Sequence, residues 1–123
     1  MASEITVSLT LSFTKGAKSE TLQDLAAKFD MAGTDFVKAT MVTATTPGAA
    51  IPQAGVGTPG WFFATNNSTT AGENIKITPE ADGSSPCILL EPGESCCCRL
   101  AATAPYAFSA TGTPELEYMI IED

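Results

Sequence analysis

The most regular pattern in the chain is a strict alternation of hydrophobic and polar residues near its start. Apolar, β-forming side chains stand at every second position from Ile5 to Phe13, and threonine or serine stands at each position between them. Successive side chains of a β-strand point to opposite faces, so this period of two predicts a half-buried strand over residues 5–13. Lys15 and Gly16 follow it, and a glycine at that place favours a turn.

Residues 19–32 fit two patterns. A helical stripe is formed by Leu22, Leu25, Ala26 and Phe29, and Ser19 is a suitable N-cap for it. Phe29 and Met31, in contrast, fit the alternation of a strand. A helix of about three turns depends on tertiary packing for its stability. We therefore leave residues 20–28 open between a short helix and a strand, and we predict a strand over residues 28–32.

The rest of the chain consists of short apolar runs separated by proline and glycine. The Thr46–Gly60 stretch contains three prolines and four glycines, which predicts a long irregular connection. Pro59 and Gly60 suit the central positions of a type II turn, and Pro92 and Gly93 suit a hairpin turn or a tight corner. We predict strands over residues 35–45, 61–64, 75–78, 87–90, 95–100, 106–110 and 116–121.

The bulky run Trp61–Phe63 carries three of the nine aromatic residues, and such a run favours a buried strand at the centre of the core. Eight or nine short strands with proline and glycine between them are typical of sandwiches and barrels. The sequence therefore predicts an all-β fold. We expect a single antiparallel β-sandwich or jelly-roll-like domain of about eight strands over residues 1–123, with at most one short helix.

The composition excludes several classes of function. The chain contains no histidine, so it cannot build a Ser-His-Asp or Cys-His nucleophile pair or a histidine-ligated zinc site. Six lysine and arginine residues against fourteen acidic residues give a net charge of −8, which disfavours binding to nucleic acid. No apolar run approaches the length of a membrane span, and the first residues lack the features of an export signal. We expect neither nucleic acid nor a membrane as a partner.

The cysteines are the feature that most invites a metal or redox interpretation. Cys96, Cys97 and Cys98 are consecutive, and Cys87 is nearby. Cysteine zinc sites usually take two C-x-x-C pairs, and this spacing does not match them. On a strand, Cys96 and Cys98 share one face and Cys97 lies on the other. We expect reduced thiols that act as small apolar residues, with a disulfide from Cys87 to the triplet and a metal site as the lesser alternatives.

The other candidate groups also favour structural roles. The spacing of Asp24, Asp30 and Asp35 differs from that of calcium-loop ligands, and Glu115 and Glu117 fit the wet face of a strand. Solvated or structural positions are also expected for Lys15, Lys18, Trp61, Gly55, Gly57 and Gly60. The three glycines match the dinucleotide-binding spacing, but a strand follows them instead of a helix. We therefore assign no catalytic residue, no cofactor-binding residue and no metal ligand, and expect a protein that is not an enzyme and uses no cofactor.

The second half of the chain contains a recognisable series of short motifs. They are Thr58-Pro59-Gly60-Trp61-Phe62-Phe63, Leu90-Glu91-Pro92-Gly93-Glu94, Arg99-Leu100-Ala101, Ala104-Pro105-Tyr106 and Leu116-Glu117-Tyr118-Met119-Ile120-Ile121-Glu122-Asp123. Together with Phe29–Gly33, they make residues 28–123 similar to small β-rich proteins encoded among the virion structural genes of tailed bacteriophages. The cysteine triplet departs from the aliphatic or aromatic residues usual in that family at this strand.

The resemblance implies a virion component made in the host bacterial cytoplasm. The leading expectation is a capsid decoration, or cement, protein that forms a homo-oligomer and binds the major capsid protein or other virion subunits. The alternatives are a tail, neck or baseplate subunit and a carbohydrate-binding or adhesin module. We expect the contact surface on the N-terminal arm and in the Thr46–Thr58 connection, because long irregular segments in compact domains are usually functional.

Overall fold

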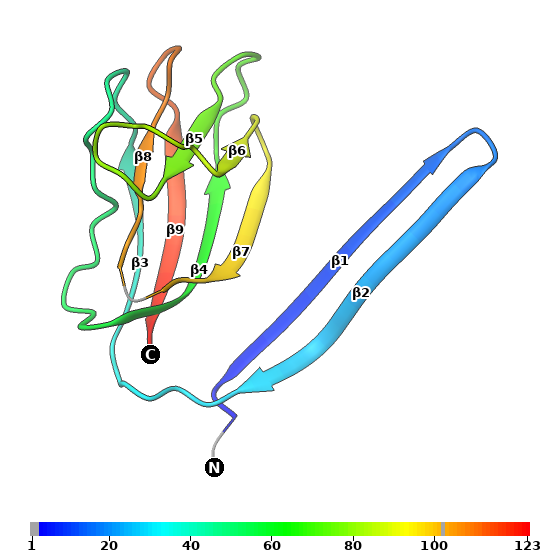
Figure 1. The fold of residues 1–123 in the computed structure, drawn as a ribbon, viewed down its shortest axis with the longest axis horizontal. Coiled ribbons are helices and arrows are strands. Elements are labelled where there is room, and N and C mark those ends of the chain that lie inside the picture. The colour runs from blue at the N-terminus through cyan, green and yellow to red at the C-terminus, as the bar shows by residue number, and fades with distance from the viewer. Residues whose placement is uncertain (1–2, 102) are drawn as a thin grey trace. The chain divides into compact units, whose positions relative to one another are not determined.

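The structure is a computed structural model that describes residues 3–101 and 103–123. Within these residues it contains no helix, and nine strands form three antiparallel sheets (Figure 1). The strands are β1 (Ile5–Lys15), β2 (Lys18–Phe29), β3 (Phe36–Val42), β4 (Pro59–Asn66), β5 (Ile75–Thr78), β6 (Ile88–Leu90), β7 (Ser95–Arg99), β8 (Tyr106–Phe108) and β9 (Glu115–Glu122). The prediction of an all-β fold is confirmed.

The segment that fitted both a helix and a strand is a strand. β2 runs through residues 20–28 and ends at Phe29, so the predicted strand over residues 28–32 is wrong beyond that point. Side chains replace the strand ladder there: the backbone N–H of Met31 donates to Glu4 Oε2 at 3.1 Å, and Asp30 Oδ1 accepts from the N–H of Ser3 at 2.9 Å.

The chain divides into two compact units, Met1–Ala32 and Gly33–Asp123. We call the first unit the arm and the second the body, and we describe each by itself. The arm contains the two-stranded sheet of β1 and β2, whereas the body contains the other two sheets. The two sheets of the body form the sandwich, and β1 and β2 of the arm form a separate two-stranded sheet.

β1 and β2 pair along their whole length, from Ile5 opposite Phe29 to Lys15 opposite Lys18. Gly16, with a φ of 61°, supplies the left-handed conformation of the turn between them. The register shifts once, between Val7 and Leu9. At this bulge Ala26 has a φ of 57°, and its N–H donates to Ser8 Oγ at 2.9 Å.

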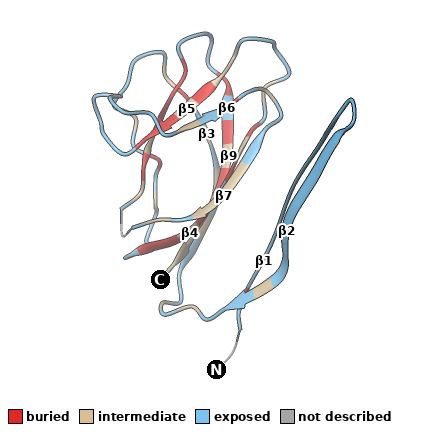
Figure 2. Cartoon of the chain, turned by 45° about the vertical axis from the view of Figure 1, so that its right-hand side comes forward, coloured by how far each residue is buried: buried red, intermediate tan, exposed pale blue. Residues whose placement is uncertain are grey.

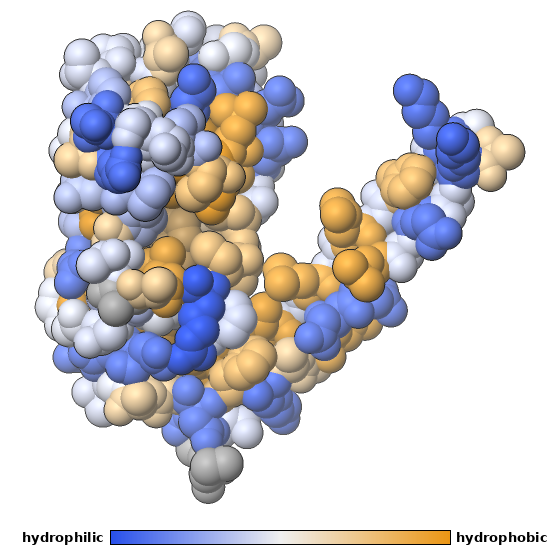
Figure 3. Space-filling model, viewed as in Figure 1, coloured by the Kyte–Doolittle hydropathy of each residue, from blue (hydrophilic) through white to orange (hydrophobic). Residues whose placement is uncertain are grey.

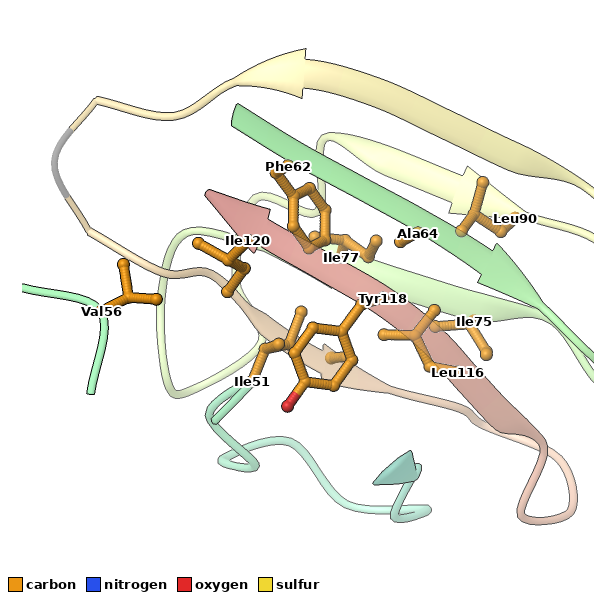
Figure 4. Packing of buried hydrophobic residues seen from close by; sticks show 11 residues of the cluster. Ile51, Val56, Phe62, Ala64, Ile75, Ile77, Leu90, Leu116, Tyr118 and Ile120 are labelled. Atoms are coloured by element: carbon orange, nitrogen blue, oxygen red, sulfur yellow. The ribbon is translucent and has the colours of Figure 1, made fainter. Parts of the chain in front are cut away.

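The body is a sandwich of a four-stranded sheet, in the order β3-β9-β4-β7, and a three-stranded sheet, in the order β6-β5-β8. Alternate side chains of both sheets meet in one core (Figure 4). The buried cluster comprises Ile51, Val56, Phe62, Ala64, Ile75, Ile77, Leu90, Ala107, Leu116, Tyr118 and Ile120. Figure 2 shows buried residues along the strands of the body and an arm that is exposed over most of its length.

Two residues of the Thr46–Thr58 connection belong to this core. Ile51 is 1% exposed and Val56 is 3% exposed, and both pack in the buried cluster. The N–H of Ile51 donates to the carbonyl of Pro105 at 3.0 Å, and the hydroxyl of Tyr118 donates to the carbonyl of Pro52 at 2.8 Å. Ile51 and Val56 are therefore committed to the fold, and the contact role expected for this connection stays a prediction that falls to its exposed residues.

The predicted turn at Pro92 and Gly93 is a corner between the two sheets. β6 pairs with β5 in one sheet, and β7 pairs with β4 in the other. The N–H of Glu94 donates to the carbonyl of Glu91 at 3.0 Å, and Gly93 has a φ of 85°, as a type II turn requires. Buried Asn66 supports the corner, because its Nδ2 donates to the carbonyls of Leu90 at 3.0 Å and Glu73 at 2.8 Å.

The predicted type II turn at Pro59 and Gly60 is wrong. Both residues lie in β4, where a register shift between Pro59 and Trp61 marks a bulge, and Gly60 has no positive φ. A Cβ at Gly60 would lie 2.7 Å from the Cβ of Asp123 and 3.1 Å from the carbonyl oxygen of Ile121. Glycine is thus required by the close approach of β9 and not by a turn.

Glu122 ties the first residues of the body to the end of the Thr46–Thr58 connection. Its Oε2 accepts from the N–H groups of Thr34 at 2.9 Å and Asp35 at 3.2 Å, and its Oε1 accepts from the N–H of Gly57 at 2.8 Å. These hydrogen bonds hold the pKa of Glu122 below its ordinary value of 4.5, and the bond from Gly57 makes the largest contribution. The carboxylate therefore fixes the point at which the chain enters the body.

We expect Glu122→Gln to lower the stability of the body at neutral pH and to change it little in acid. A carboxyl whose folded pKa is depressed stabilises the fold above its unfolded pKa, and this contribution is lost as the pH falls through the lower folded value. Urea midpoints of both proteins, measured at neutral pH and in acid, test this. Glu117→Gln removes a carboxylate from the same strand as a control, and an equal effect of Glu122→Gln at both pH values would contradict the assignment.

Candidate interaction surface

The arm has one apolar face. Residues that are opposite each other in an antiparallel pair point to the same side of the sheet, so the register of β1 and β2 determines which side chains gather. The apolar face of the arm consists of Ile5, Val7, Leu9, Leu11, Phe13, Leu22, Ala27 and Phe29. Leu11 stands directly opposite Leu22, which places the two leucines at the middle of the ribbon.

The opposite face of the arm is a polar face, rich in hydroxyl groups. Threonine and serine alternate along β1 from Thr6 to Thr14, and their partners in β2 are Lys28, Gln23, Thr21 and Ser19. Thr14 Oγ1 donates to Ser19 Oγ at 3.3 Å across the ribbon. The arm is therefore amphipathic, with the period of two that usually marks a sheet covered on one side.

The apolar face of the arm is nevertheless exposed. Leu11 is 77% exposed, Leu22 is 80% exposed and Phe13 is 54% exposed, whereas Ile5 is buried. The strand predicted over residues 5–13 is confirmed, but the prediction that it is half-buried is wrong. Figure 3 shows hydrophobic side chains along the arm, and Leu9, Leu11 and Leu22 line a shallow open depression on it.

Such an exposed apolar face is unusual for a two-stranded ribbon. Isolated two-stranded hairpins are marginally stable in water and need further strands or another packed element. Exposed apolar surface also costs free energy, about 25 cal/mol per Å² relative to burial. Contiguous apolar patches of this kind mark sites of interaction with other macromolecules.

The charged residues on the apolar face of the arm are separated by sign: the basic residues lie at the turn and the acidic residues lie further from it. Lys15 and Lys18 form the last pair before the turn, Glu20 stands opposite Phe13, and Asp24 stands opposite Leu9. Two like charges directly opposite each other are unfavourable in a free ribbon. The tip of the arm is therefore a local positive site that favours an acidic partner.

The body has a second apolar surface on the outside of its four-stranded sheet. Strand register aligns the side chains of this outer face in rows. The first row is Phe36–Ile121–Trp61–Arg99, the second is Lys38–Met119–Phe63–Cys97, and the third is Thr40–Glu117–Thr65–Ser95. Phe36 is 64% exposed and Phe63 is 40% exposed, so the first two rows present aromatic surface with lysine and arginine at their ends.

The composition of the aromatic run in β4 predicted that the whole run is buried in the core. Only part of it is. Phe62 is 1% exposed and packs in the buried cluster, whereas Trp61 and Phe63 point to the outer face. Trp61 is half-buried there, between Ile121 on one side and Arg99 on the other. Arg99 also forms an ion pair with Asp123 at the edge of this face.

The cysteines lie as strand alternation predicts. Cys96 and Cys98 pack against the core, Cys97 belongs to the outer face, and all four cysteines are free thiols. Burial raises the pKa of Cys96 to about 11, and burial also raises the pKa values of Cys97 and Cys98. The thiolate is the form that attacks electrophiles and binds metals, so these thiols are poorly suited to either role at neutral pH.

The remaining candidate groups do not converge on a site. Asp24 lies on the arm ribbon, Asp30 accepts the hydrogen bond from Ser3, and the carbonyl of Asp35 accepts from the N–H of Glu122. Glu115 and Glu117 share the outer side of β9, as alternation predicts. Among the described residues, no three carboxylate or thiol groups are close enough together to hold a metal ion. In the same residues, no helix is long and apolar enough to cross a bilayer.

Comparison with known proteins adds no relative: no protein-family model matches the chain, and neither a curated protein nor a solved structure is significantly similar to it. The geometry of the two apolar surfaces therefore carries the functional argument. Sequence reasoning assigned a contact role to the N-terminal segment, but it did not find the outer face of the body. The signal for that face was the alternation of Phe36, Lys38 and Thr40 along one strand and of Met119 and Ile121 along another.

Proposed function

We propose that this protein is a non-enzymatic structural subunit of a virion, and that it decorates the capsid of a tailed bacteriophage. The observation that carries the proposal is the exposed apolar face of the arm, centred on Leu11 and Leu22. A surface of this kind is stable in water when another protein covers it. The resemblance of residues 28–123 to virion proteins of tailed bacteriophages is the reason for proposing that the covering protein belongs to a virion.

The chemistry of the body agrees with a binding role. Its polar groups close turns and fix loops, as Glu122 and Asn66 do, and burial raises the pKa values of Cys96, Cys97 and Cys98. From residue 33 onward, ten acidic residues oppose three basic ones and give a net charge of −7. A strongly charged small domain remains soluble during assembly while its apolar surfaces make the specific contacts.

Binding to capsid shells tests the proposal directly. The purified full-length protein is mixed with shells that lack it, and the protein that sediments with the shells is quantified. We expect saturable binding at a fixed ratio to the major capsid protein, and weaker binding by a Leu11→Asp/Leu22→Asp variant. Thr10→Asp/Gln23→Asp introduces the same charges on the polar face of the arm and is the matched control. Absence of the protein from purified virions would refute the proposal.

A tail, neck or baseplate subunit is the second candidate, and the length of the arm favours it. β1 contains 11 residues, which at about 3.3 Å per residue gives a ribbon of about 36 Å, long enough to bridge neighbouring subunits in a stacked or ring-shaped assembly. Labelling the protein in intact particles and imaging them separates the two structural roles, because a label on the tail excludes capsid decoration.

Carbohydrate binding is supported by one observation, the aromatic surface of Phe36, Trp61 and Phe63 on the outer face. Sugar rings stack on such surfaces, and Trp61→Ala would then abolish glycan binding without unfolding the body. A glycan array without signal from the wild-type protein removes this candidate.

A further inference from the structure

We propose that the apolar face of the arm binds the outer face of the four-stranded sheet in a second copy of this chain. The inference deepens the proposed function and rests on it, because it identifies the partner of the arm within the assembly. Each copy would then both donate an arm and accept one. This arrangement is heterologous, so it generates either a closed ring or an extended row of subunits.

The two surfaces are of the same kind, because each presents large apolar side chains that are exposed. On the arm, Leu11 and Leu22 form a central apolar pair that is about four-fifths exposed. On the body, Met119 and Phe63 occupy the centre of the outer face, and Phe63 is 40% exposed. Two β-sheets pack face to face when the apolar side chains of one fill the spaces of the other. The contact would extend the sandwich by a third layer.

The two faces can be aligned row by row. Side chains on one face of a strand recur at every second residue, so the pairs along the arm and the rows across the sheet have the same spacing. Aligning the Lys15–Lys18 pair with the Val42–Glu115 pair places Leu11 and Leu22 over the row of Met119 and Phe63. One step further, Leu9 and Asp24 then lie over the row that contains Trp61 and Arg99.

Charge favours this direction at both ends of the contact, whereas between them the same alignment places Glu20 over the row of Glu117, where two carboxylates repel each other. The basic tip of the arm, Lys15 and Lys18, would meet Glu115 of a body whose net charge is −7. Asp24 would meet Arg99 at the other end of the contact. The lysine pair is unfavourable in the free arm, and an acidic neighbour relieves the repulsion between the two ammonium groups.

A complementation experiment with the full-length protein tests the proposal. The arm variant is Leu11→Asp/Leu22→Asp, and the sheet variant is Phe63→Asp, each followed by sedimentation velocity over a range of concentrations. Each substitution places a charge in the proposed contact, so we expect each variant alone to associate at least about 30-fold more weakly than wild type, the effect of losing a strong interface residue. A mixture of the two variants is expected to form heterodimers, because the arm of one and the sheet of the other are intact.

Matched controls exclude a general effect of added charge. Thr10→Asp/Gln23→Asp lies on the polar face of the arm, and Leu89→Asp replaces a leucine that is 51% exposed on the other sheet of the body. Both controls are expected to associate like wild type. Phe36→Asp, on the same outer face and 64% exposed, replaces Phe63→Asp if that variant does not fold.

Three outcomes would overturn the inference. The arms bind each other if the mixed variants form no heterodimer while the sheet variant alone associates. The arm covers its own body if the wild-type protein is monomeric at every concentration and its arm is protected from protease. The arm binds only a different protein if the wild-type protein is monomeric and its arm is unprotected. Capsid binding by such a monomer would leave the proposed function intact, whereas loss of both kinds of binding would refute both.

Discussion

Phe62→Ala is expected to destabilise the body by about 3–5 kcal/mol, which is a large part of the stability of a small domain. Phe62 is 1% exposed and is among the largest fully buried side chains. It projects from β4 into the core, where it packs against residues of the facing sheet. Truncation removes the transfer free energy of the ring and leaves a cavity that close-packed neighbours fill only in part. Urea unfolding followed by circular dichroism measures the loss.

Phe63→Ala is the matched control for this prediction. The residue is adjacent and chemically identical, but it lies on the outer face and is 40% exposed. Surface substitutions away from buried contacts usually change stability by about 0.5 kcal/mol or less, and the partial burial of Phe63 raises the expected loss to about 1 kcal/mol. Similar losses for the two variants would contradict the assignment of Phe62 to the core and Phe63 to the surface.

This pair of residues shows what the sequence could and could not predict about the body. Local patterns located the strand around Trp61, because bulky apolar residues after a proline and glycine have few other stable conformations. The run Trp61–Phe62–Phe63 has no polar residue to mark an outer face, so the sequence did not reveal which ring turns inward. That choice depends on the position of the facing sheet, which contains β5 and β6, and only the tertiary structure specifies it.

The glycine at position 60 illustrates a second limit. Proline followed by glycine is a frequent turn signal, and the sequence analysis interpreted Pro59 and Gly60 in this way. In the structure the glycine is needed because Ile121 of β9 and Asp123, which follows β9, approach it closely. A glycine that is required because a residue more than sixty positions away packs closely against it cannot be distinguished, in the sequence, from a glycine that is required by a turn.

The arm shows that the hydrophobic pattern of a strand predicts its conformation but not its burial. Alternation from Ile5 to Phe13 correctly predicted a strand, because the period of two is a property of the backbone. The same alternation predicted that one face of the strand is buried, and this prediction was wrong. An amphipathic pattern indicates that one face is suited to a covering partner, but it does not identify that partner. The helix alternative for residues 20–28 survived because the bulge at Ala26 breaks the alternation in β2 and mimics a helical stripe.

The sequence therefore did not predict which residues compose either apolar surface. The N-terminal segment was expected to make contacts, but its apolar face combines Leu9 and Leu11 with Leu22 from the second strand, and this combination requires the hairpin register. The outer face of the body requires four strands in an order that does not follow the sequence. Surfaces assembled from distant strands leave only short alternating fragments in the chain.

Trypsin is expected to cleave the free protein after Lys15 and Lys18 at least about 100-fold faster than after Lys38 and Lys76. Cleavage requires local unfolding, and the free energy of local opening ranges from near zero in poorly supported segments to the global value in core strands. The arm lysines lie in a two-stranded ribbon with an exposed apolar face, whereas Lys76 lies in β5, the central strand of its sheet. Mass spectrometry of timed digests of the dilute protein measures the four rates.

The comparison among lysines also connects stability with assembly. Lys38 is the internal control, because it lies on an edge strand but is paired with Met119 of β9 along a continuous ladder. If a partner covers the arm, cleavage after Lys15 and Lys18 slows in proportion to the fraction bound, while cleavage after Lys38 and Lys76 remains slow throughout. Protection of the arm lysines in a dilute monomer would contradict a separately unstable arm, since it would require the ribbon to be stable alone or to be covered by its own body.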